Sequence, residues 1–255
     1  MCRQVMFRTA WQTNERRRAV PRREWLPLRG QRSGLICLRR KRGGPLTAPS
    51  NPFTLAEWRR SMASEYASVR SDVADPVRTA QRFRAARDRL FIEHPESPIA
   101  LSRRRAWRGV DWYAYAPAWR LTGVIEAAVK RATFEIVLAT DGILRCTRIG
   151  QVRFSVGGRP ARLAVYWLEG YGGGIWLPFA DTTSGVDTYG GGRYLYDTIK
   201  GADLGASERE LVLDFNYAYN PSCAYDDRWS CPLSPAENRL AFAIPAGERL
   251  PPGSR

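Results

Sequence analysis

Apolar and polar residues alternate along the second half of the chain, a pattern that predicts a domain built from β-strands. The alternation starts at about Trp112 and has a period of two, which places one face of each strand in a core. Turn signals such as Asp141-Gly142 and Gly157-Gly158 separate the segments. About eight or nine short strands without intervening helices predict a mainly β fold, an antiparallel sandwich or a partly closed barrel. The expected strands are 120–129, 134–138, 143–149, 152–156, 163–167, 175–180, 192–196, 211–217 and 240–244.

Two helices are predicted before this sheet. Thr54 and Glu57 have the spacing of a capping box, with Thr54 as the N-cap, and apolar residues then recur at helical spacing. Asp75-Pro76 is a second helix start, and this helix should end before Pro95. We expect a helical segment over residues 53–95 that packs on a β domain over 96–250, followed by a tail over 251–255. The many arginines of the helices should face solvent.

Charge is concentrated at the start of the chain. Residues 1–52 hold 13 Lys and Arg against 2 Asp and Glu, a net charge of +11, whereas the remainder holds 27 against 23, a net charge of +4. This leader lacks hydrophobic periodicity, so we expect it to be disordered and dispensable. Either it is a basic arm for nucleic acid or anionic lipid, or it is a passive tail or the product of an upstream start codon. No aromatic platform accompanies the arginines, which favours the second interpretation and limits nucleic acid to nonspecific contact.

Several classes of protein do not fit the sequence. No apolar run approaches the roughly 18 residues of a membrane span, and no secretory signal is evident, so we expect a cytoplasmic protein without membrane partners. The glycine triplets lack the Lys-Ser/Thr of a phosphate-binding loop, and no Gly-x-Ser-x-Gly elbow occurs. His94 is the single histidine, which excludes zinc sites with two or three histidines and suggests a structural role at a helix end.

Polar residues gather between the apolar strands in two places and form the candidate site. The first group lies between the strands expected over 175–180 and 192–196. The second lies at the end of the 211–217 strand, where alternation would put Asp214 and Asn216 on one face. Arg193 can pair with one of three aspartates in these groups or with a ligand carboxylate or phosphate. The candidate ligand-binding residues are Asp181, Asp187, Tyr189, Arg193, Asp214, Asn216 and Asn220.

Three functions remain open for these residues. The first is a pocket that binds a small polar or anionic ligand. The second is a hydrolase-like enzyme, in which two of Asp181, Asp187 and Asp214 form an acid–base pair. The third is a hydrogen-bonded network in a structural or interaction protein without a ligand. Neither a cofactor nor a catalytic residue can be assigned.

Cys223 and Cys231 are the weak candidates for a metal site. Their two thiolates would supply half of a tetrahedral zinc site, but no histidine or further cysteine lies nearby in the sequence. A disulfide across the loop is the alternative in an oxidising compartment. The interpretation we favour is that both are buried, reduced cysteines.

Several segments together resemble the bacterial and archaeal family called domain of unknown function 1684. The resemblance extends from about Leu55 to Glu248 and excludes the leader. Because the function of that family is unassigned, the resemblance implies a domain boundary and no activity. The segments that carry it are LAEWRR, RDRLFIEHPESPI, the strand with Asp141-Gly142, WLPFADTTSGVDTYGGGRYLY, LDFNYAYNPSCAY, CPLSPAENRL and IPAGER.

Overall fold

The computed structural model describes residues 51–138 and 142–251, and it begins with two long helices. Helix α1 spans Pro52–Ser71, α2 spans Pro76–Glu93, and the short α3 spans Leu101–Arg104. Asp75 caps α2 as predicted, because its carboxylate accepts a hydrogen bond from Arg78 N at 3.0 Å. The leader, the Asp141-Gly142 turn and most of the tail fall partly or wholly outside the described residues.

The predicted cap of α1 is wrong. The N-cap is Asn51, whose side-chain Oδ1 accepts a hydrogen bond from Phe53 N at 3.0 Å, and Pro52 occupies the first helical position. A proline is favoured there because its missing N–H would have no partner in the helix. Thr54 lies inside the first turn instead, where its hydroxyl donates to Asn51 O and contacts Glu96.

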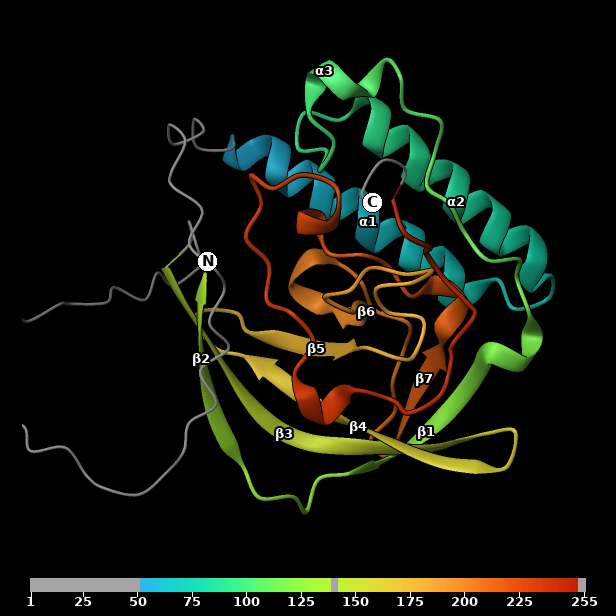
Figure 1. Cartoon of the computed structure of the whole chain (residues 1–255), viewed down its shortest axis with the longest axis vertical. Coiled ribbons are helices and arrows are strands. Elements are labelled where there is room, and N and C mark those ends of the chain that lie inside the picture. Colours follow the sequence, from blue (N-terminus) through green and yellow to red (C-terminus); the bar gives the residue numbers. More distant parts are fainter. Residues whose placement is uncertain (1–50, 139–141, 252–255) are drawn as a thin grey trace, which may run out of the picture. The chain divides into compact units, whose positions relative to one another are not determined.

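Seven strands in the described part of the chain form one antiparallel sheet that curls into a half-barrel (Figure 1). Their order is β6-β5-β4-β3-β1-β7, and β2 pairs with the first half of β3 beside β1. This confirms a mainly β fold with two preceding helices and corrects the expected number of strands. The strands are β1 Arg120–Glu126, β2 Ala132–Leu138, β3 Gly142–Val156, β4 Arg159–Leu168, β5 Gly174–Phe179, β6 Arg193–Asp197 and β7 Glu210–Asp214.

Two differences explain the lower number of strands. The segments 143–149 and 152–156 belong to the single strand β3, whose pairing with β4 shifts register between Arg148 and Gly150. The segment 240–244 is not a strand, since only isolated main-chain bonds such as Leu240 N to Ala180 O join it to the sheet. The carbonyl of Ile244 accepts from the Arg193 side chain instead.

The hairpin between β3 and β4 confirms the Gly157-Gly158 turn. Gly157 has φ 54° and Gly158 has φ 80°, and Val156 pairs with Arg159 across them. Two successive positive φ values match the twist of the flanking strands, which is why glycine is favoured at both positions.

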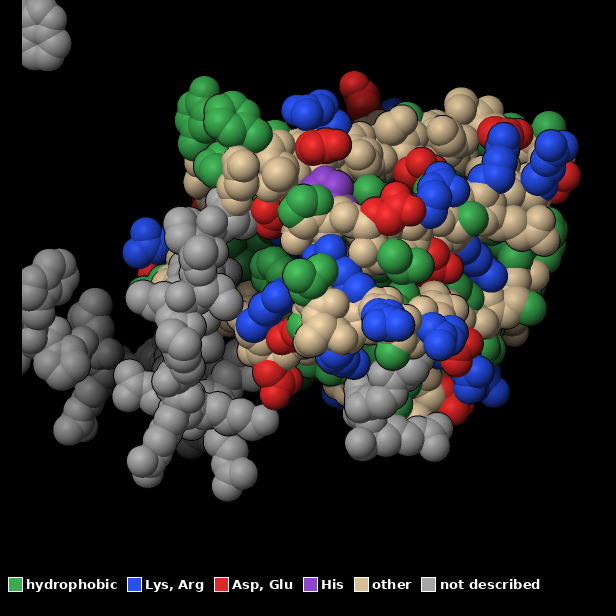
Figure 2. All heavy atoms as spheres, turned by 90° about the horizontal axis from the view of Figure 1, so that it is seen from above, with side chains coloured by type: hydrophobic (Ala, Val, Ile, Leu, Met, Phe, Trp, Pro, Cys, Tyr) green, Lys and Arg blue, Asp and Glu red, His purple; other side chains and the backbone are tan. Residues whose placement is uncertain are grey.

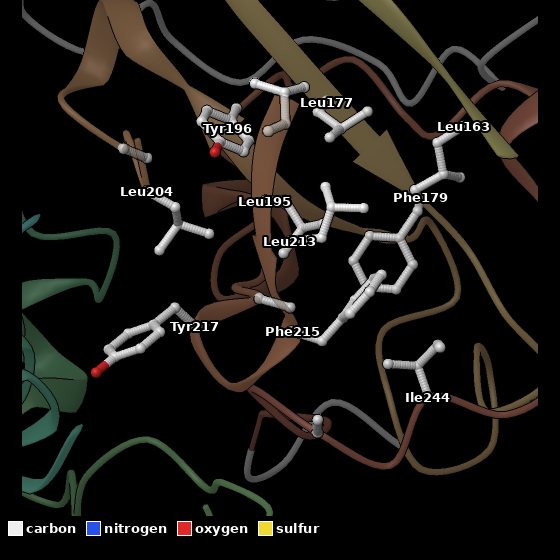
Figure 3. Packing of buried hydrophobic residues seen from close by; sticks show 14 of the residues in the cluster. Leu163, Leu177, Phe179, Leu195, Tyr196, Leu204, Leu213, Phe215, Tyr217 and Ile244 are labelled. Atoms are coloured by element: carbon white, nitrogen blue, oxygen red, sulfur yellow. The ribbon is translucent and has the colours of Figure 1, made fainter. Parts of the chain in front are cut away.

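The main core lies between the helices and one face of the curled sheet (Figure 3). Met62 and Tyr66 of α1 and Phe83 of α2 join it from the helical side, and the rings of Phe83 and Tyr217 meet edge to face at 5.0 Å between centroids. The strands and the C-terminal segment contribute Leu163, Leu177, Phe179, Leu195, Tyr196, Leu213, Phe215 and Ile244.

The outer face of the helices is charged. Figure 2 shows Lys and Arg side chains interspersed with Asp and Glu over this face, which agrees with the expected solvated arginines. Two arginines of α2 differ: Arg87 is only 5% exposed, and Arg84 is half-buried against the ring of Trp112. Among the described residues, none of the helices combines the length and apolar character needed to cross a membrane.

Candidate functional site

Asp181 and Arg193 form a buried ion pair at the end of β5 and the start of β6. Arg193 Nη2 donates to Asp181 Oδ2 at 2.8 Å, and neither side chain is more than 1% exposed. The other carboxylate oxygen accepts from the main-chain N–H of Thr183 at 2.7 Å and from its hydroxyl at 2.6 Å. Of the three aspartates that the sequence offered to Arg193, the structure therefore selects Asp181.

The two terminal nitrogens of Arg193 also hold the C-terminal segment. Its guanidinium donates to Ile244 O at 3.0 Å, to Glu248 O at 3.2 Å and to Ala246 O, and it lies 5.0 Å from the ring centroid of Phe179. Burial lowers the pKa of Arg193, and the Asp181 carboxylate opposes that shift. Both terminal nitrogens of Arg193 are thus bonded to the protein, whereas its Nε is buried without a partner among the described residues.

Asp214 and Asn216 lie in a second, separate cluster. Strand β7 ends at Asp214, whose Oδ1 accepts from Asn216 N at 3.1 Å and from Asn216 Nδ2 at 2.9 Å, so the chain turns into a 3₁₀ helix over Phe215–Tyr217. The prediction that both side chains share one strand face is therefore wrong. Arg120 Nη1 lies 3.4 Å from Asp214 Oδ2.

The Asp214 side chain is fully buried. Burial raises the pKa of its carboxyl group, while the bonds from Asn216 and Arg120 oppose the increase. Asn216 in turn accepts from Ala116 N and donates to Ala116 O, each at 2.9 Å. This cluster joins the loop before β1 to the end of β7, which is a structural role.

Asp187 and Tyr189 lie in the β5–β6 connection and are half-buried. The Asp187 carbonyl accepts from Leu250 N at 2.8 Å, and the Tyr189 hydroxyl lies 3.6 Å from Cys223 Sγ. The seven candidate residues are thus divided among different clusters, and Asn220 is the one of them that lines either cavity described below.

Glu248 is the centre of a third cluster, which the sequence did not reveal. The fully buried carboxylate accepts from Arg87 Nε at 2.5 Å, from Asn220 N at 2.7 Å and from the Tyr225 hydroxyl at 2.5 Å. Burial by itself would lower the pKa of Arg87, but Glu248, Tyr225 and Tyr66 together outweigh it and raise that pKa. Both Glu248 oxygens are occupied, so it anchors Arg87 in place.

The sequence contains a hint that Arg87 is buried, but α2 contains several other arginines that it does not distinguish as clearly. Arg87 is four residues from both Phe83 and Phe91, so it lies within the apolar stripe of α2. Its guanidinium carbon lies 4.6 Å from the ring centroid of Phe91 and 5.1 Å from that of Tyr219. Nothing in the sequence linked it to Glu248, because the two residues are 161 positions apart.

Next to this cluster is a cavity of about 50 Å³, here called the Arg87 cavity. Asp197 and Asn220 line it, and Asp197 Oδ1 and Asn220 Oδ1 are buried without a hydrogen-bond partner among the described residues. The Lys200 ammonium lies 3.7 Å from Asp197 Oδ2, and its side chain is 51% exposed. The wall also includes Trp58, Met62, Arg87, Phe91, Pro98, Tyr194, Tyr219, Pro221, Ser222 and Tyr225.

A more open hollow of about 420 Å³ lies along α1 and α2. Glu57, Glu65, Glu93 and His94 are among its lining residues. His94 is the C-cap of α2, as its sequence position suggested, and its Nδ1 accepts from Glu96 N at 3.1 Å. His94 Nδ1 therefore already has a hydrogen-bond partner in the turn that follows α2.

Cys223 and Cys231 are both free thiols and lie side by side. Cys223 N donates to Cys231 Sγ at 3.4 Å. Within residues 51–138 and 142–251, no group of three or more His, Cys, Asp or Glu side chains is placed to hold a metal ion.

Comparisons with known proteins confirm the family suggested by the sequence, over a shorter part of the chain than the expected residues 55–248. A family model described as protein of unknown function (DUF1684) matches residues 105–249, which include β1 to β7, Asn220, Tyr225 and Glu248. The chain is also similar to an uncharacterized protein from Haloarcula marismortui, solved by solution NMR. The two share 31% identity and a TM-score of 0.49 over 66% of this chain and 91% of that chain. No curated protein matches the chain. Because the family model covers more than half of the sequence, the chain belongs to the DUF1684 family.

Proposed function

We propose that the protein binds a small polar ligand in the Arg87 cavity. The observation that carries this proposal is a pair of buried acceptors, Asp197 Oδ1 and Asn220 Oδ1, which lack partners among the described residues and belong to two residues that line the cavity. Leaving a buried polar group unpaired costs about 1–3 kcal/mol. Two unpaired acceptors beside one cavity therefore favour a ligand that donates hydrogen bonds to them.

The chemistry of the wall limits the kind of ligand. Both unpaired atoms accept hydrogen bonds, so the ligand should carry N–H or O–H groups. Arg87 can donate to an oxygen atom of the same ligand, and Lys200 adds a positive charge beside Asp197. A water molecule needs roughly 10–15 Å³ of such space, so a cavity of about 50 Å³ holds only a few non-hydrogen atoms.

The alternative of a carboxylate-dependent hydrolase has less support. Asp181 is bonded to Arg193 and Thr183, and Asp214 is bonded to Asn216 and lies beside Arg120. Neither residue lines the Arg87 cavity or the open hollow along the helices. A general acid or base must reach a reacting group, and these two carboxylates lack such access.

Amide chemical shifts measured by NMR provide the test. Methylammonium and formamide supply donors, whereas acetate supplies only acceptors, so the first two should shift the resonances of Tyr219 and Asn220 at millimolar concentration. Asp197→Asn should weaken methylammonium binding at least about tenfold, because the bond to a charged group is worth about 1.5–3 kcal/mol. Binding of acetate alone would instead assign the cavity to an anion held by Arg87 and Lys200.

Asp111→Asn is the matched control. Asp111 is an exposed carboxylate 3.2 Å from Arg249 Nη1, and it does not line the cavity. If no compound shifts these resonances, or if the two aspartate variants bind methylammonium alike, the cavity is filled by water and the proposal is wrong.

A further inference from the structure

Cys223 and Cys231 form a cluster that the proposed function does not use. Both lie in the loop that follows β7, where Ser222–Ala224 forms a 3₁₀ helix. Cys231 is 6% exposed, and Cys223 is half-buried. The backbone N–H of Cys223 donates to Cys231 Sγ at 3.4 Å, which brings the two residues together across the loop. The two sulfur atoms are therefore already neighbours in the folded chain.

We propose that Cys223 and Cys231 are a reversible dithiol–disulfide pair that reacts with peroxide, with Cys231 as the first nucleophile. Four donors or charges act on Cys231: the Cys223 thiol, the main-chain N–H groups of Cys223 and Ser222, and the Lys200 ammonium. Each of them stabilises a thiolate more than a thiol. Cys223 is less buried than Cys231 and lies beside it, so it is placed to resolve the oxidised intermediate.

The acidities of the two thiols agree with these roles. The hydrogen bond from Cys223 lowers the pKa of Cys231 to about 7 against the effect of burial, and Lys200 contributes in the same direction. The same hydrogen bond, together with burial, raises the pKa of Cys223. At pH 7 about half of the molecules therefore carry a Cys231 thiolate, while Cys223 keeps its proton.

The chemistry balances with hydrogen peroxide as the oxidant. The Cys231 thiolate attacks one peroxide oxygen, the O–O bond breaks, and hydroxide leaves and takes up a proton to become water. Cys231 is then a sulfenic acid. Cys223 loses its proton and attacks that sulfur, the S–O bond breaks, and a second water leaves as the S–S bond forms. A dithiol such as dithiothreitol returns the pair to the reduced state and is itself oxidised to a cyclic disulfide.

Cys146 is a matched internal control. It is 1% exposed, and burial together with Glu169 and Glu237 raises its pKa to about 11. Cys146 and Cys231 are therefore similarly buried and differ mainly in the charges around the sulfur. At pH 7 the larger thiolate population outweighs the lower nucleophilicity of the more acidic thiol, so Cys231 should react at least ~10-fold faster than Cys146.

The experiment uses the full chain with Cys2→Ser and Cys37→Ser, treated with hydrogen peroxide and analysed by mass spectrometry. The chain should lose two hydrogen atoms, a peptide linking Cys223 to Cys231 should appear, and dithiothreitol should reverse both changes. In the Cys223→Ser variant, dimedone should trap a sulfenic acid on Cys231. Circular dichroism establishes that each variant is folded.

Two results would overturn the proposal. One is oxidation of the folded chain that adds oxygen without forming the Cys223–Cys231 link. The other is dimedone labelling of Cys146 at the same rate as Cys231. If the Cys223→Ser variant does not fold, timed alkylation of the reduced parent chain with iodoacetamide compares Cys231 with Cys146 directly, and equal rates would again refute the assignment.

Discussion

Two buried arginines, Arg87 and Arg193, connect distant parts of the chain through charge-assisted hydrogen bonds. Arg193 joins Asp181 to three carbonyls of the C-terminal segment, and Arg87 joins α2 to Glu248. A buried charge is tolerated only when it is paired and hydrogen-bonded. The loss of one partner therefore affects stability more strongly than the pair contributes by itself.

The Asp181–Arg193 pair predicts a strongly non-additive double-mutant cycle. Asp181→Asn and Arg193→Gln should each lower the free energy of unfolding by about 3–5 kcal/mol, because each leaves the other charge buried and unpaired. The double variant should be less destabilised than the sum of the two. Urea unfolding measures all three values.

The exposed Glu135–Arg145 pair, with a 2.8 Å N–O distance, is the control for this cycle and should change stability by no more than ~1 kcal/mol. Asp214 should show little coupling to Arg193, because its partners are Asn216 and Arg120. Near-native stability of both single variants at Asp181 and Arg193 would contradict the structural role of the pair.

The pKa of Cys231 predicts a pH-dependent reactivity. Only the thiolate is alkylated, so the iodoacetamide rate at Cys231 should rise with pH and reach half of its plateau near pH 7. Lys200→Gln removes a positive charge that favours the thiolate, so the midpoint should move to higher pH. Lys130→Gln, a change in the β1–β2 connection, is the control. An unchanged midpoint in Lys200→Gln would show that the hydrogen bond from Cys223 is sufficient.

At the scale of the elements, local turns and caps determine where the buried clusters lie. Asp214 ends β7 by accepting from Asn216 N, and Gly247 bends the C-terminal segment so that Glu248 reaches Arg87. Gly247 has φ 80°, and a side chain at this position would come within 2.5 Å of Ala218 O. Only glycine fits both the conformation and the space.

Gly247→Ala should therefore destabilise the protein by more than Gly158→Ala. Gly158 has the same φ of 80°, but nothing lies within 4 Å of the position that a Cβ would occupy. Both variants incur the backbone strain, about 1 kcal/mol or more. Only Gly247→Ala adds a steric clash and displaces Glu248. Thermal unfolding of both variants tests this, and equal losses would show that the segment moves freely around Gly247.

At the scale of the whole molecule, the C-terminal segment over residues 244–248 links the edge of the sheet to the helices. Residues 244–248 bind Arg193 of β6 through their carbonyls, and Glu248 binds Arg87 of α2 and the loop that contains Asn220 and Tyr225. Main-chain bonds from Tyr113 N to Gly247 O and from Glu248 N to Ala218 O add to these. Helices and sheet therefore depend on one another through this segment.

The leader allows a test on the same scale. Composition predicts that deleting residues 1–50 changes the melting temperature by no more than about 2 °C, because disordered tails make few stabilising contacts. Extending the deletion through Asn51 removes the cap of α1 and should cost about 1 kcal/mol. Differential scanning calorimetry compares the two truncations. A large loss on removing residues 1–50 alone would show that the leader packs on the domain.

The sequence by itself determined the features that depend on neighbouring residues. The Asp75-Pro76 start of α2, its end before Pro95 and the Gly157-Gly158 hairpin were all predictable, because caps and turns are set within a few positions. Period-two alternation also gave the mainly β class and most strand positions. The cap of α1 was assigned wrongly because Asn51-Pro52 and Thr54-Glu57 are both valid start signals three residues apart.

Only the tertiary structure decided which charged residues meet. Alternation suggested that Asp214 and Asn216 share a face, but a local hydrogen bond ended the strand at Asp214. The sequence allowed Arg193 to pair with any of three aspartates, and the fold brings Asp181 next to it. The pairing of Arg87 with Glu248, and with it the Arg87 cavity, has no local signature, because contacts across 161 positions depend on how the helices pack on the sheet.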